Sequence, residues 1–123
     1  MGERPPALVV TSGDARLELL PYTVCWSTAT SGYCADGIPP DPLPSLGEIG
    51  EAIEIFWPFA GWEFAASLHQ EGADAVEVVL GVRPGGWVIE VEDLEGNYEV
   101  SLSGFGPQGD VHYQFSVEVV PAD

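Results

Sequence analysis

The two cysteines, Cys25 and Cys34, are the residues whose type and spacing most directly suggest chemistry. A structural zinc site needs a tetrahedral set of ligands, and the two histidines, His69 and His112, lie far from the cysteines on outward-facing strand positions. The Cys-x8-Cys spacing differs from the Cys-x-x-Cys of redox motifs, and no base adjoins either thiol to activate it as a nucleophile. The sequence therefore favours one disulfide, Cys25–Cys34, with two separate buried thiols as the alternative.

This disulfide would close the short hydroxylated loop Ser27–Tyr33. By the loop-entropy relation it would stabilise the fold by about 2–3 kcal/mol. A stable disulfide implies an oxidising compartment, so we expect an extracellular or cell-envelope location. The proline-rich segment Ile38–Pro44 follows and should form a stiff connection.

Calcium is the cofactor that the carboxylates could best hold. Asp36 and Asp41 lie in one loop region, and Asp110 lies in the turn Gly106–Asp110. The ligand spacing of an EF-hand is missing, and Asp-Gly is also ordinary turn chemistry. We therefore expect no metal and no cofactor.

Signatures of catalysis are also missing from the sequence. It contains no Gly-x-Ser-x-Gly elbow and no phosphate-binding or dinucleotide fingerprint. Serine, histidine and aspartate are all present, but only in composition. We therefore expect a non-enzymatic protein, with no catalytic residues to assign.

Four tryptophans are many for 123 residues. Trp62 fits an inward strand face, whereas Trp57 and Trp87 lie at strand ends, where exposed aromatic side chains often anchor protein or sugar ligands. Each tryptophan alone is more often core than surface. The candidate binding surface comprises Tyr33, Asp36, Asp41, Trp57 and Trp87.

The charge balance excludes whole classes of partner. The chain carries 20 acidic residues, three arginines and no lysine, for a net charge of −17. A nucleic-acid binder needs clustered cations to displace phosphate counterions, and adhesion to anionic lipid needs a basic patch. Neither class of partner suits this chain.

Alternating apolar and polar residues dominate the sequence and predict strands with one buried face. The clearest case is Val111–Val119. Strands about every ten residues, separated by glycine and proline turns, predict an all-β, immunoglobulin-like antiparallel β-sandwich of about 7–9 strands. Within Leu46–Phe56 a helical face is the alternative, although the β-rich end favours a strand. The expected strands are Ala7–Thr11, Ala15–Leu20, Tyr22–Trp26, Ala52–Phe56, Trp62–Leu68, Ala75–Val82, Trp87–Glu92, Tyr98–Leu102 and Val111–Val119.

The domain should span residues 7–121, because residues 1–6 form a proline-containing lead-in without the apolar core of a signal peptide. Such a lead-in fits a cytosolic protein or a domain whose upstream export signal and tether have been removed.

Several motifs together resemble a family. Cys-Trp, a short loop and Cys-Ala-Asp-Gly-Ile-Pro-Pro, then Gly61–Phe64 and Gly106–Val111, look like small secreted or lipid-anchored actinobacterial cell-envelope domains of unknown function. The resemblance implies an exported protein whose lipid anchor would lie upstream of this chain, and it implies no catalytic residues.

The leading functional hypothesis is a non-enzymatic envelope module that binds protein or glycan, or serves a structural role. The alternative is a secreted inhibitor that inserts loops into a protease, suggested by the turn Arg83-Pro84-Gly85-Gly86-Trp87.

Overall fold

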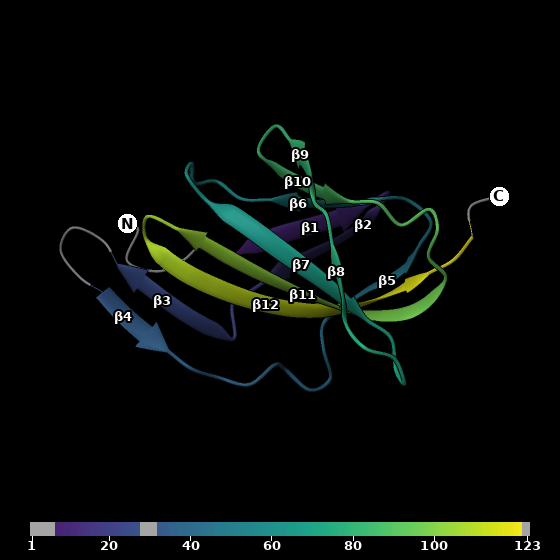
Figure 1. The fold of residues 1–123 in the computed structure, drawn as a ribbon, viewed down its shortest axis with the longest axis horizontal. Coiled ribbons are helices and arrows are strands. Elements are labelled where there is room, and N and C mark those ends of the chain that lie inside the picture. The colour runs from purple at the N-terminus through teal and green to yellow at the C-terminus, as the bar shows by residue number, and fades with distance from the viewer. Residues whose placement is uncertain (1–6, 28–31, 122–123) are drawn as a thin grey trace.

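The computed structural model describes residues 7–27 and 32–121, which form twelve strands and no helix. The lead-in 1–6 and residues 28–31 of the predicted stapled loop lie outside the described residues. The strands form two sheets that stack as a sandwich, with β12, β11 and β7 in one layer and β1, β2 and β6 in the other (Figure 1). The predicted all-β sandwich is confirmed.

The first sheet, sheet A, has five strands in the order β2-β1-β6-β10-β9. All of its neighbouring strands are antiparallel. Its members are β1 (Leu8–Ser12), β2 (Ala15–Leu19), β6 (Ile53–Phe56), β9 (Gly81–Arg83) and β10 (Gly86–Ile89).

The second sheet, sheet B, has seven strands in the order β4-β3-β12-β11-β7-β8, with β5 parallel to the later part of β12. The long strand β12 therefore pairs with β11 on one side and with β3 and then β5 on the other. The members are β3 (Thr23–Ser27), β4 (Gly32–Ala35), β5 (Ser45–Ile49), β7 (Glu63–His69), β8 (Val76–Val78), β11 (Gly96–Gly106) and β12 (Gly109–Val119).

The core lies between the sheets and is formed by the faces that alternation predicts. Along β12 every second residue from Val111 to Val119 is buried, while His112 and Glu118 keep partial exposure. The same alternation places Leu8 and Val10 of β1 and Ile53 and Ile55 of β6 in the core, all with no exposed surface. Burial of these apolar side chains is the main stabilising term of the fold.

Twelve strands exceed the expected seven to nine because one predicted segment divides and two strands, β4 and β5, were not foreseen. Ala75–Val82 is two strands: β8 pairs with β7 in sheet B, and β9 pairs with β10 in sheet A. The chain crosses between the sheets at Val79 and Leu80, so this crossing joins one edge of each sheet. The region Leu46–Phe56 contains β5 and β6, so the helical alternative is wrong. The immunoglobulin-like connectivity stays a prediction.

Candidate functional site

Aromatic side chains gather between the sheets at the end of the sandwich that carries the turn after β6. Trp57 lies at the centre of this cluster and is only 4% exposed, so it belongs to the core, and its expected place on an exposed surface is wrong. Its Nε1 has no hydrogen-bond partner among the described residues, and neighbouring rings approach it edge to face, an arrangement that favours aromatic pairs. Rings within 6.5 Å of Trp57 belong to Trp26, Phe59, Trp62, Phe64 and Tyr113.

A cleft of about 500 Å³ opens beside this cluster. One wall is the turn from Trp57 to Trp62, and the other is the hairpin from Val82 to Trp87. The backbone N–H of Trp57 donates to the carbonyl of Gly85 at 3.0 Å and so ties the two walls together. A proline at position 84 and a positive φ of 77° at Gly85 suit a type II turn. The cleft is therefore built from two short and well-defined connections.

Trp87 is the partly buried ring of the cleft. It lies on β10 opposite Val82 of β9, and its ring centroid is 4.8 Å from that of Phe64 on the facing sheet. β8 pairs only with Ala66–Leu68, so the earlier part of β7 has no partner on that side among the described strands. Trp87 therefore lies where this end of the sandwich is least covered.

Two glycines of β11 make room for two rings that we call the floor: Trp62, which lines the cleft, and Phe64, which packs against Trp87 beneath it. A Cβ atom on Gly104 would lie 2.5 Å from the ring of Phe64, its partner on β7, and one on Gly106 would lie 2.3 Å from the ring of Trp62. The indole N–H of Trp62 donates to Oε1 of Gln108 at 2.7 Å. These contacts hold the two rings in place.

Arg83 supplies a cation at the rim of the cleft. Its guanidinium lies 3.8 Å from the carboxylate of Glu90, and both side chains are more than half exposed. Such an exposed pair contributes little to stability. Among the described residues the only other arginine is Arg16, which pairs with Glu18 on β2. Arg83 is therefore the one arginine of the described chain that lies beside the aromatic cleft.

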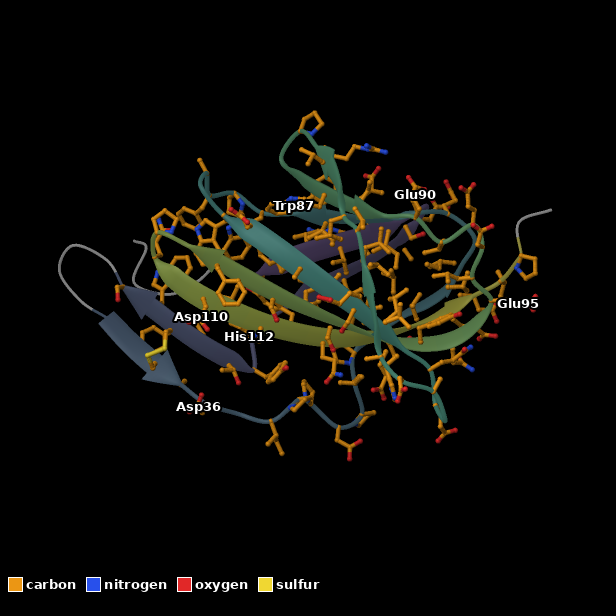
Figure 2. The ribbon with its side chains drawn as sticks, in the orientation of Figure 1. Asp36, Trp87, Glu90, Glu95, Asp110 and His112 are labelled. Atoms are coloured by element: carbon orange, nitrogen blue, oxygen red, sulfur yellow. A yellow bond between two sulfur atoms is a disulfide. The ribbon has the colours of Figure 1, made fainter. Side chains whose placement is uncertain are left out.

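The other predicted surface residues lie elsewhere. Tyr33, Asp36 and Asp41 are all exposed, on β4 and the segment that follows it, and Figure 2 places Asp36 well away from Trp87. The structure brings Trp57 and Trp87 to one cleft but does not bring these three residues to it. No group of three side chains suited to holding a metal occurs in the part of the chain that the structure describes.

The predicted disulfide Cys25–Cys34 is present and links β3 to the edge strand β4. The two cysteines are direct partners across the strand pair, with their Cα atoms 4.0 Å apart. Every described residue of β4 is exposed, so apolar burial does little to hold this strand. The covalent link is consistent with an oxidising compartment.

A hollow of about 550 Å³ on sheet B is acidic. Its lining includes Glu48, Glu71, Glu99 and Glu118, and His69 lies 3.6 Å from Glu99. Clustered carboxylates of this kind favour cations or basic partners over anions. Tyr98 is the one aromatic residue of its lining, whereas several aromatic rings line the cleft.

Sequence reasoning missed a hydrogen-bonded chain on the outer face of sheet B. Ser103 Oγ lies 3.0 Å from Nδ1 of His112, and Nε2 of His112 lies 2.9 Å from Oδ2 of Asp110. Figure 2 shows Asp110 and His112 side by side on β12. Their spacing of two residues places both on one face of a strand, and a tight turn at Pro107 and Gln108 pairs Ser103 with His112. Recognising that hairpin would have predicted the contact.

Comparison of the chain with protein-family models, curated proteins and solved structures finds no match. The resemblance to envelope domains therefore stays a prediction. No helix in the described ranges has the length and apolar character to cross a membrane.

Proposed function

We propose that this protein is an exported, non-enzymatic binding module of the cell envelope that takes the end of a glycan in the aromatic cleft. The observation that carries the proposal is the half-buried ring of Trp87, set in a cleft of about 500 Å³ at one end of the sandwich. Ligand sites commonly occupy clefts of roughly 300–1,000 Å³ with mainly apolar and aromatic linings and a few polar groups.

The chemistry of the lining suits a sugar. The C–H face of a pyranose ring packs on an aromatic ring, and Trp87 and Phe59 are the rings that are only partly buried there. The guanidinium of Arg83 and the backbone of the Pro84–Gly85 turn provide polar groups for hydroxyls at the rim.

The electrostatic field of the protein favours some glycans over others. A net charge of −17 repels anionic polymers, and the single arginine beside the cleft is already paired with Glu90. The preferred ligand is therefore a neutral sugar.

Titration with neutral and uronic-acid oligosaccharides, followed by tryptophan fluorescence and calorimetry, tests this proposal. W87L should weaken binding by about 2- to 13-fold through the aromatic contact alone, since such a contact contributes roughly 0.5–1.5 kcal/mol beyond its buried area. F105A is the matched control, because Phe105 is 54% exposed but lies on β11 away from the cleft. Equal affinity of W87L and wild type, or no binding to any neutral oligosaccharide, would reject the assignment.

Export rests on a different observation, the disulfide between β3 and β4. We expect protein isolated from its native cells under thiol-trapping conditions to carry no free thiol. Two trapped thiols in that preparation would remove the argument for an oxidising compartment.

A secreted protease inhibitor is the second candidate, favoured by the hairpin that forms one wall of the cleft. Val82 is 78% exposed, and Arg83, Pro84 and Gly85 are exposed beside it. An exposed apolar and basic tip of this kind could enter a protease cleft. A panel of serine and cysteine proteases that shows no inhibition at micromolar protein would eliminate this candidate.

A further inference from the structure

The hydrogen-bonded chain on the outer face of sheet B lies at a site separate from the aromatic cleft. Ser103 comes from β11, and His112 and Asp110 come from β12. The serine and histidine are direct cross-strand partners, with 3.0 Å between Oγ and Nδ1. The histidine and aspartate side chains are 25% and 32% exposed, so the group is reachable from solvent while being partly shielded.

With Asp110 ionised and the imidazole of His112 neutral, the directions of both hydrogen bonds follow from the chemistry of the three side chains. An ionised carboxylate only accepts, so the 2.9 Å contact requires that Nε2 of His112 carries a proton and donates it to Asp110. Neutral imidazole then has its lone pair on Nδ1, which accepts the hydroxyl hydrogen of Ser103. Ser103 Oγ therefore directs its proton toward a base and keeps its own lone pairs available.

Nucleophile, base and orienting group are recognised by this geometry rather than by their order in the sequence. Here the serine meets Nδ1 and the carboxylate meets Nε2, the reverse of the usual use of the two nitrogens. Either ring nitrogen of a neutral imidazole can act as a base once the other is protonated. The reversal therefore preserves the chemistry of proton removal.

The surroundings leave one side of the serine open. On the β7 side, the partner of Ser103 is Ala65, which is exposed and contributes only a methyl group. On β11, the ring of Phe105 meets the imidazole of His112 edge to face at 6.0 Å. The site lies on two long paired strands, which hold such groups more firmly than loops do.

We propose that Ser103 is a base-activated nucleophile that accepts an acyl group from an activated carboxylic ester. Ser103 Oγ attacks the carbonyl carbon while its proton passes to Nδ1 of His112. The bond to the leaving oxygen then breaks, and the alcohol departs with that proton. The products are an ester on Ser103 and one free alcohol, so the atoms balance.

The same sheet limits the reaction to one acylation per chain. β11 pairs with β12 and with β7 on both sides of Ser103, so the neighbouring backbone N–H groups belong to the strand ladders. Fast turnover needs such donors aimed at the developing oxyanion. Ser103 is therefore an acylation site, and this inference is independent of glycan binding.

Incubation with p-nitrophenyl acetate, with mapping of acetyl groups by mass spectrometry, tests the inference. The chain has no lysine, so side-chain amine acylation cannot obscure the result. Ser101 is an internal control, since it lies on the same face of β11 but pairs with Gln114 instead of histidine. General-base assistance typically contributes a factor of about 10²–10⁴, so Ser103 should be acetylated at least about a hundredfold faster than Ser101.

Three variants complete the test. S103A should carry no acetyl group at this position, and H112Q should reduce the Ser103 rate to that of Ser101. D110N probes the positioning role of Asp110: the rate should fall at least tenfold while the thermal midpoint stays unchanged. Equal rates at Ser103 and Ser101, or a Ser103 rate that H112Q leaves unchanged, would overturn the inference.

Discussion

Replacing Gly104 of β11 with alanine should destabilise the protein by crowding the floor of the cleft. The new Cβ would lie 2.5 Å from the nearest ring carbon of Phe64 and 2.7 and 2.9 Å from the next two. Carbon atoms prefer separations of about 3.5–4.0 Å, so the ring would have to move by roughly 1 Å. It cannot move freely, because Trp87 and Trp57 lie against it, with centroids 4.8 and 5.3 Å away.

The expected loss follows from two opposing terms. Overpacking of this kind costs about 1–3 kcal/mol, and the φ angle of Gly104 is not positive, so the backbone itself accepts alanine. Alanine also restricts the unfolded chain, which returns about 0.4–1 kcal/mol. The net loss is about 1.3 kcal/mol at the middle of both ranges and at most about 2.6 kcal/mol. At roughly 2.1 cal/mol/K per residue for 123 residues, the midpoint should fall by about 5 °C, and by at most about 10 °C.

Urea unfolding followed by tryptophan fluorescence, with the disulfide intact, measures this loss. F64L shortens the side chain that the new Cβ would meet. G104A should therefore cost at least about 0.5 kcal/mol less unfolding free energy in the F64L protein than in wild type. G32A is the matched control, since its Cβ would meet the exposed Ser27 side chain, 3.0 Å from Oγ, and the Trp26 carbonyl oxygen at an ordinary contact distance of 3.5 Å. A G104A protein as stable as wild type, or additive effects of G104A and F64L, would refute the crowding argument.

Three further perturbations probe other parts of the fold. The double variant C25A/C34A should lose about 2–3 kcal/mol of unfolding free energy, measured in urea. A loss below about 0.5 kcal/mol would contradict this and would mean that β4 separates from β3 once the disulfide is absent. Burial raises the pKa of the Tyr113 phenol well above its ordinary value of about 10. The unfolded chain therefore loses this proton at a lower pH than the folded chain, and stability is lost as the pH rises above about 10. Comparing thermal midpoints at pH 8 and pH 11 should show a larger drop for wild type than for Y113F, and equal drops would contradict this. G85A should cost about 1–2 kcal/mol through its positive φ alone, since no atom lies within 4 Å of the added Cβ, and a calorimetric midpoint equal to wild type would contradict this.

Most of the strands could be predicted because their burial alternates. Val111–Val119 and Trp62–Leu68 show every second residue facing the core, as the sequence pattern requires. β4 could not be found in this way, since all its residues are exposed and no alternation exists to detect. The division of Ala75–Val82 between two sheets was hidden for a different reason: the run Val78–Val82 contains no polar side chain to mark where the chain changes partners.

The site was only partly predictable. The sequence pointed to Trp87 as an aromatic residue at a strand end, and the structure places it in the lining of a cleft. The burial of Trp57 depends on four rings from three other segments that pack around it. Ser103 and His112 meet because the β11–β12 hairpin continues to Gly106 and Gly109. Ending the strand at Leu102 placed Ser103 in a turn and concealed its partner.

The position of β12 has a consequence for the order in which the chain can fold. Its partners β3, β5 and β11 all precede it in the sequence, and β3 and β5 reach the rest of sheet B only through it. Before Gly109–Val119 has been synthesised, sheet B therefore lacks the strand that joins β3 and β5 to β11. Sheet B can therefore be completed only once Gly109–Val119 is available for pairing.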